Sequence, residues 1–167
     1  MTRETSVVEQ QEASKDAVVT RIGQAVMLLH GGDREEARNR FRAIWVEIGE
    51  DGDALHRCTL AHYMADTQDD PGDELAWDLR ALTAAEGLTG AAAAEHRDAL
   101  AVRSFFPSLH LNLAADYLKL ERFEAARVHL DHAWDSVGVL ADDGYGGGIR
   151  AAIGRLEQRM RRSGAGE

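Results

Sequence analysis

The chain has 167 residues, of which 44% are hydrophobic and 29% charged, the balance typical of a globular domain with its own core. Its 29 acidic residues against 19 Lys and Arg give a formal net charge of −10, which repels a phosphate backbone unless the bases gather on one face. We therefore expect no nucleic-acid partner. We also expect no membrane partner, because no apolar run approaches the length needed to cross a bilayer.

The first residues, "MTRETSVVEQQEASKDA", carry acids and glutamines where a signal peptide would need an apolar stretch. The single cysteine, Cys58, cannot form an internal disulfide, which fits a reducing compartment. Both features favour a cytoplasmic protein. We expect a disordered tail over residues 1–14, one helical domain over 15–162 and a second disordered tail over 163–167.

Apolar residues recur at helical steps of three and four over residues 18–29 and again over 37–48, which predicts two amphipathic helices. Between them lies "HGGDREE". Its glycines can end the first helix and Asp33 can cap the second, with Glu36 placed as the return arm of a capping box. The first 50 residues therefore predict a helical hairpin.

The same pattern recurs twice along the chain. Helical spacings follow "EDGD" over residues 54–66, and a partner helix is predicted after them with Asp70 as its cap and Pro71 in its first turn. In the third instance, Pro107 is expected in the first turn of a helix that reaches Leu120, and another helix starts near Phe123. No alternating β-branched run predicts a strand.

Two connecting segments complete the predicted elements. In "EGLTGAAAAEHRDALAVRSFF", Thr89 is placed to cap a separate alanine-rich helix over about 91–102. After Leu140, "ADDGYGGG" predicts a turn, and "IRAAIGRLEQRM" predicts a last amphipathic helix. The sequence therefore predicts an all-α protein of seven or eight helices.

The stretch "NLAADYLKLERFEAARVHLDHAW" orders small, aromatic and bulky apolar residues as two closely packed helices require, and it resembles the tetratricopeptide repeat family. The resemblance is good over residues 107–138, weaker over 18–50 and weakest over 54–85. The second-helix alanines at 37, 76 and 126 lie farther apart than the family period of roughly 34 residues. The resemblance implies stacked antiparallel hairpins, a TPR-like α-solenoid of about three repeats with a C-terminal capping helix.

The resemblance also implies a function, because such repeats bind a peptide segment or a partner domain in a concave groove lined by their first helices. We therefore expect a non-catalytic adaptor without cofactor or metal, whose protein partner the sequence does not identify. For the apolar members of the implied groove, core packing is an equal explanation. Asn112 and Lys119 are expected to hold the backbone and an acidic group of the bound segment. The implied groove residues are His30, Cys58, Thr59, His62, Asp66, Leu111, Asn112, Ala115 and Lys119.

An alternative is a metal or thiol site around Cys58, His62 and Asp66, which lie on one helical stripe and are all competent zinc ligands. Three ligands along one straight helix span about 12 Å, so they need a further partner such as His30 or His110 to hold one ion. A thiolate at Cys58 with His62 as its base would be a nucleophile, but a small buried cysteine is the commoner explanation. We therefore predict no metal and no catalytic residue.

Five arginines lie in or near the predicted last helix of this acidic protein. They are expected either to form a solvated basic end that complements the helix dipole or to contact an acidic partner or nucleic acid. His129 and His132 are one turn apart and are expected on a solvated face. The five arginines are Arg150, Arg155, Arg159, Arg161 and Arg162.

Overall fold

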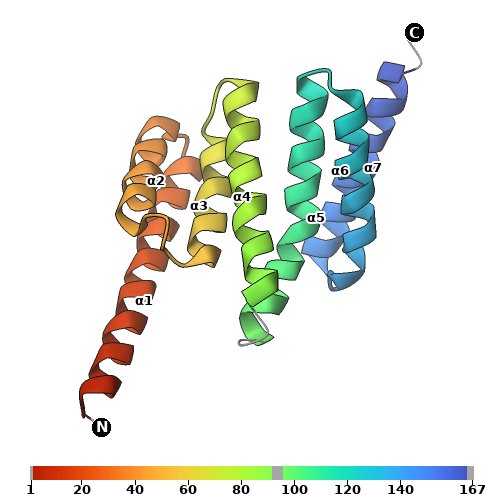
Figure 1. The fold of residues 1–167 in the computed structure, drawn as a ribbon. Helices are drawn as coiled ribbons and strands as arrows, with labels where there is room; N and C mark the ends of the chain where they lie inside the picture. Colours follow the sequence, from red (N-terminus) through yellow and green to blue (C-terminus); the bar gives the residue numbers. More distant parts are fainter. Residues whose placement is uncertain (1, 92–95, 165–167) are drawn as a thin grey trace.

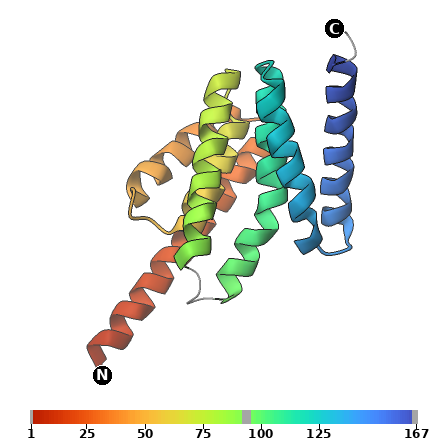
Figure 2. The same ribbon diagram turned by 45° about the vertical axis from the view of Figure 1, so that its right-hand side comes forward.

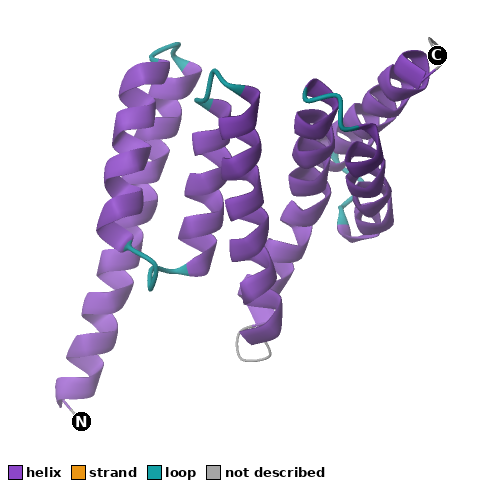
Figure 3. Cartoon of the chain, turned by 45° about the horizontal axis from the view of Figure 1, so that its top comes forward, coloured by secondary structure: helices purple, strands orange, loops and turns teal. Residues whose placement is uncertain are grey.

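The computed structural model describes residues 2–91 and 96–164, with side chains over 6–88 and 103–164. Over these residues it contains seven α-helices, one 3₁₀ turn (Val137–Val139) and no strand (Figure 3). The all-α prediction is confirmed for this part of the chain. The helices are α1 (Thr2–His30), α2 (Arg34–Ile48), α3 (Ala54–Asp66), α4 (Pro71–Ala91), α5 (His96–Lys119), α6 (Phe123–Ser136) and α7 (Gly144–Gly164).

The helices lie side by side in chain order, so the two ends of the chain are at opposite ends of the molecule (Figures 1 and 2). The most extensive packing joins α3 to α4 and α5 to α6, followed by α4 to α5 and α1 to α2. Helix α7 packs against both α5 and α6. Of the described helices, none is long and apolar enough to span a lipid bilayer.

Helix starts follow the capping residues. Asp33 accepts a hydrogen bond from the Glu36 N–H (3.3 Å), and Asp70 accepts from the N–H groups of Gly72 and Asp73. Both predicted caps are confirmed. The return arm of the capping box is not formed, because the Glu36 carboxylate instead accepts from Arg40 Nε one turn on (2.9 Å).

Three apolar clusters hold the helices together. The N-terminal core joins α1, α2 and α3 through Ile22, Ala25, Ala37, Phe41, Ile44, Leu60 and Met64. The middle core joins α3, α4 and α5 through Cys58, Ala61, Ala81, Ala85 and Leu109. The C-terminal core joins α5, α6 and α7 through Ala114, Ala126, Leu130, Ala133, Ile153, Leu156 and Met160. Alanine recurs in all three, and its small side chain lets the helix backbones approach closely.

The structure describes helix in part of each expected tail. Residues 2–14 are the first turns of α1, which extend away from the remaining helices with exposed side chains over 6–14 (Figure 1). Residues 6–14 have no amphipathic period in the sequence, which agrees with the exposure of all their side chains. At the other end α7 continues to Gly164, and the expected tail at 165–167 lies outside the described residues.

The segment before Pro107 also differs from the prediction. Helix α4 runs through Thr89 to Ala91, residues 92–95 lie outside the described part, and α5 begins at His96. Pro107 is therefore inside α5 rather than in its first turn, and no separate helix occupies the described residues of 91–102. Phe105 and Phe106 pack against the middle core, and this tertiary contact outweighs the hydrogen bond that a proline removes from a helix.

The predicted turn at "ADDGYGGG" is shorter than expected, because α7 already begins at Gly144. The Asp143 carboxylate accepts a hydrogen bond from the Gly146 N–H (2.8 Å) and so caps the helix. A Cβ atom on the buried Gly146 would lie 2.1 Å from the Ala141 carbonyl oxygen. This close approach requires a residue without a Cβ atom at position 146.

Candidate functional site

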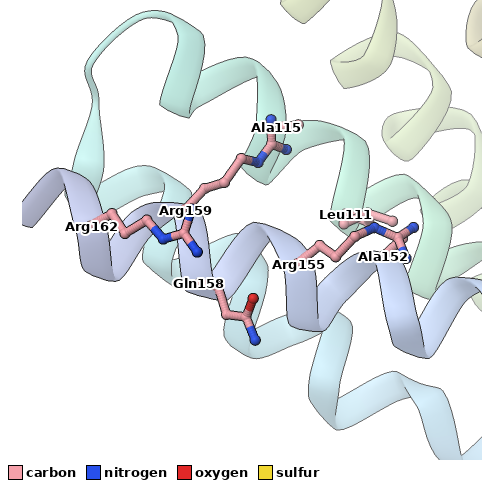
Figure 4. A pocket seen from close by; sticks show the side chains of 7 residues that line it. All are labelled: Leu111, Ala115, Ala152, Arg155, Gln158, Arg159 and Arg162. Atoms are coloured by element: carbon pink, nitrogen blue, oxygen red, sulfur yellow. The ribbon is translucent and has the colours of Figure 1, made fainter.

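Two features of α5 are candidates for function. Its face towards α7 lines an open groove of about 590 Å³, and its face towards α4 carries buried carboxylates. We call the first the arginine groove. It is lined by Leu111, Ala115, Ala152, Arg155, Gln158, Arg159 and Arg162 (Figure 4).

The spacing of apolar residues and arginines along α7 explains how this groove forms. Ile153, Leu156 and Met160 bury one stripe of the helix in the C-terminal core. The groove arginines occupy a neighbouring stripe at steps of four and three residues, so that their side chains leave α7 on the side facing α5 (Figure 4). The predicted groove residues Leu111 and Ala115 supply the apolar opposite wall.

The arginines of α7 have different surroundings. Arg150 donates to the carbonyl oxygens of Val137 and Leu140, and Arg161 forms an ion pair with Glu157 (3.3 Å). The three groove arginines are exposed, and within the described residues none of them forms an ion pair and no acidic side chain lines the groove. Three of the five arginines in the predicted basic end therefore form the cationic side of a groove whose other side is apolar.

The second feature is the carboxylate cluster, which consists of Glu74 and Asp78 on α4 and Asp116 on α5. One carboxylate oxygen from each residue lies within 4.8 Å of the others. Asp78 and Asp116 are only 2% and 1% exposed, and neither Asp78 Oδ1 nor Asp116 Oδ2 has a hydrogen-bond partner. Burial, reinforced by the hydrogen bond to Asp116 and by its charge, raises the pKa of Asp78 to about 10. Burial also raises the pKa of Asp116 to about 7, an effect that the hydrogen bond with Asp78 opposes and Glu74 reinforces.

Four of the predicted groove residues have partners within the protein near this cluster: His62 and Asn112 are half-buried, and Asp66 and Lys119 are exposed. Asn112 Nδ2 donates to His62 Nδ1 (3.2 Å), and Lys119 Nζ donates to both carboxylate oxygens of Glu74 (2.9 and 2.8 Å). Burial raises the pKa of Asp66, and the Glu74 charge adds to this effect. Asn112 and Lys119 therefore link α5 to α3 and α4, a role that the sequence prediction did not include.

The other predicted residues do not converge on a reactive site. His30 is exposed at the end of α1, and Thr59 Oγ1 donates to the Leu55 carbonyl oxygen (2.9 Å). Cys58 is 2% exposed in the middle core, and burial raises the pKa of its thiol to about 12. Cys58 is therefore a protonated core side chain rather than a thiolate near neutral pH. Among the described residues, Cys58, His62 and Asp66 do not bring three ligand atoms to one point.

A histidine stack lies between α5 and α6. The His110 ring stacks on those of His129 and His132, with centroids 5.3 and 5.0 Å apart, and Nδ1 atoms of His110 and His129 lie 3.0 Å apart. The Tyr117 ring also stacks on that of His129, with their centroids 5.4 Å apart. The expectation of a solvated face is thus wrong for His129, which is half-buried, while His132 is exposed.

The histidine stack predicts a loss of stability in mild acid. Burial, with the His129 and His132 charges, lowers the pKa of His110 to about 4, whereas an unfolded histidine titrates near 6.5. The unfolded chain therefore takes up this proton first, so its contribution is complete above about pH 6.5 and is lost as the pH falls towards about 4. We expect His110→Phe to flatten the pH dependence of urea unfolding in this window by about 1–2 kcal/mol, reduced from the full shift because His110 is only half-buried. The matched control His30→Gln, at an exposed site, should keep the wild-type slope, and an identical slope in His110→Phe would contradict the prediction.

Sequence reasoning missed the carboxylate cluster, although a signal for it was present. Asp78 lies on the stripe of α4 that carries the buried Ala81, Leu82 and Ala85, at steps of three, four and seven residues. An acid on a buried stripe is unusual unless it is paired or neutralised. Asp116 continues the buried stripe of Leu109 and Leu113 in the same way.

Comparisons with protein-family models, with curated proteins and with solved structures find no match for the chain. A functional assignment therefore depends on the chemistry of the arginine groove and the carboxylate cluster.

Proposed function

We propose that the chain is a non-catalytic interaction module, a TPR-like stack of three helical hairpins capped by α7, which binds an acidic peptide segment in the arginine groove. The consecutive packing of α1 with α2, α3 with α4 and α5 with α6 supports the hairpin stack. Of the three second-helix alanines that the resemblance places at close helix contacts, Ala37 and Ala126 are fully buried and Ala76 is half-buried. A lone buried cysteine is consistent with a role in the cytoplasm.

The observation that carries the proposal is a set of arginines without acidic partners that lines a groove together with apolar side chains. A guanidinium group binds a carboxylate through two parallel hydrogen bonds, so each groove arginine can take one acidic side chain. Arg155 and Arg159 lie one helical turn apart, about 5.4–6 Å along α7. Acids one turn apart in a helical segment, or two residues apart in an extended one, match this spacing. Leu111, Ala115 and Ala152 leave room for an apolar side chain between them.

Nucleic acid is a poorer match for the same groove. Three arginines neutralise few phosphates, while the whole chain carries a formal charge of −10. The groove also offers no exposed aromatic ring on which a base would stack, since its non-arginine lining is Leu111, Ala115, Ala152 and Gln158. A thiol site receives no support from the protonated Cys58.

The test is a selection of random displayed peptides on the full chain, followed by affinity measurements on the selected sequences. We expect wild type to enrich peptides with two or more acids around an apolar residue. Arg155→Glu combined with Arg159→Glu should weaken their binding by about tenfold for each arginine, since a hydrogen-bonded charge pair contributes about 1.5–3 kcal/mol. The control is Arg161→Glu, which makes half of that charge change on the same helix outside the groove, and it should bind like wild type where either single groove variant loses about tenfold.

Two results would contradict this function. One is enrichment of neutral or basic peptides by the wild-type chain. The other is an equal loss of affinity in Arg161→Glu, which would assign the effect to net charge instead of the groove. Binding of a labelled single-stranded RNA that competes with the acidic peptides would favour the nucleic-acid alternative.

A further inference from the structure

The carboxylate cluster gathers three acids, and among the described residues only one cation, Lys119, is bonded to it. Three carboxyl groups approach within 4.8 Å where two of them, Asp78 and Asp116, are almost fully buried. Like charges at this separation in a dry interior repel strongly, and buried carboxylates are normally paired, protonated or bound to a metal. Lys119 bonds both oxygens of Glu74 and thereby supplies one positive charge, but Asp78 Oδ1 and Asp116 Oδ2 still have no partner.

The cluster has the geometry of an oxygen-ligand site. Glu74 and Asp78 are one turn apart on α4 and project from the same face, and Asp116 meets them from α5. The Glu74 side chain is 22% exposed and that of Lys119 is 51% exposed, so the cluster opens to solvent at this end and closes at the two aspartates. An ion can thus enter past Glu74 and reach two preformed, desolvated carboxylates.

We propose that Glu74, Asp78 and Asp116 bind a hard divalent cation of the Mg²⁺, Mn²⁺ and Ca²⁺ class. Carboxylate oxygens are the ligands that these ions prefer, and water can complete their coordination. Zinc is a poorer match, because the set contains no imidazole or thiolate and Nδ1 of the nearby His62 is engaged by Asn112. The raised pKa values of Asp78 and Asp116 agree with a site that needs a compensating charge, either a proton or an ion.

Lys119 occupies the mouth of this site and gives the proposal a directional consequence. Its ammonium group holds Glu74, which a bound cation requires as a ligand, so Lys119 and the ion compete for the same carboxylate. A purely structural role of the cluster would make Lys119 stabilise it in every condition. The cation site instead predicts that removal of the ammonium group strengthens ion binding.

The experiment titrates the full chain, freed of metal by EDTA and dialysis, with MnCl₂, MgCl₂ and CaCl₂ in separate calorimetric runs and thermal melts. We expect saturable binding of one ion per chain with a rise in Tm. Asp78→Asn and Asp116→Asn should each weaken binding by at least about 10–100-fold, the loss found for outer-shell partners of a metal site, while keeping or raising the Tm of the metal-free chain because an amide carries no charge for the neighbouring carboxylates to repel. Lys119→Met should bind several-fold more tightly than wild type. The matched control Glu35→Gln, an exposed acid on α2, should leave binding unchanged.

Several results would overturn the proposal. They are the absence of saturable binding of all three ions by wild type, unchanged binding in both Asn variants, and weaker binding in Lys119→Met. If circular dichroism shows that the Asn variants do not fold, Glu74→Gln at the partly exposed end of the cluster replaces them, with the same expected loss. Peptide binding in the arginine groove is measured separately, so either proposal can fail while the other holds.

Discussion

Gly146→Ala is expected to lower the free energy of unfolding by about 3 kcal/mol, at the upper end of the usual effect of overpacking. The added Cβ atom would lie 2.1 Å from the Ala141 carbonyl oxygen, a separation that no flexible side chain can relieve. Either the loop before α7 or the first turn of α7 has to move. The Arg150 contacts to the carbonyl oxygens of Val137 and Leu140 tie the same loop to α7 and oppose that movement. Urea unfolding followed by circular dichroism measures the effect.

Two neighbouring glycines provide the control with the opposite sign. A Cβ atom on Gly147 or Gly148 would meet no other atom within 4 Å. Both are exposed positions in the first turns of α7, so Gly147→Ala and Gly148→Ala should raise stability by about 0.5–1 kcal/mol through helix propensity. If Gly146→Ala behaves like these two variants, the loop is not held against α7 as the structure shows.

The sequence alone correctly predicted the structural features that depend on residues close together along the chain. The caps at Asp33 and Asp70 follow from a side chain that reaches an N–H two or three residues ahead, and both are present. The helical spacing of apolar residues likewise predicted a helix in each of the seven segments that form one, and it placed Ala37 and Ala126 at buried positions. These are local properties, and a single sequence contains them.

The errors concern properties that arise only when helices meet. The start of α5 at His96 depends on Phe105 and Phe106 packing on another part of the chain, which a proline rule cannot anticipate. The capped start of α7 depends on the approach of Ala141 to Gly146. In both cases a contact formed on folding outweighed the preference of the local sequence for a turn or a helix end.

The candidate site shows the same division. Leu111 and Ala115 were predicted to line a concave groove of the first helices, and they line a different groove whose arginines come from α7, which the sequence predicted only as a capping helix. Asn112 and Lys119 were expected to be available to a partner and instead have partners within the protein. Two polar groups on different helices form a hydrogen bond only if the helices bring them close enough. The spacing of residues along the sequence does not reveal that distance.

The separation of the cores has a consequence for cooperativity. The N-terminal core and the C-terminal core share no buried residue, and α4 with the middle core lies between them. In a stack whose helices contact mainly their neighbours, stability is close to a sum of local terms, and one end can open while the other stays folded. A damaging substitution at one end therefore tests whether the molecule is such a stack.

Phe41→Ala is the substitution of choice at the N-terminal end, and we expect it to destabilise that end by about 3–5 kcal/mol. Phe41 is fully buried, and its ring stacks on that of Tyr63 with the centroids 5.7 Å apart, so truncation removes contacts in both α2 and α3. Hydrogen exchange under native conditions should show faster exchange in α1, α2 and α3, while α5, α6 and α7 keep the protection of wild type. Leu130→Ala, in the C-terminal core, should give the opposite pattern, and it should also impair binding in the arginine groove that Phe41→Ala leaves intact. Equal loss of protection along the whole chain in Phe41→Ala would show that the molecule unfolds as one unit, and would remove the main energetic argument for a stack of hairpins.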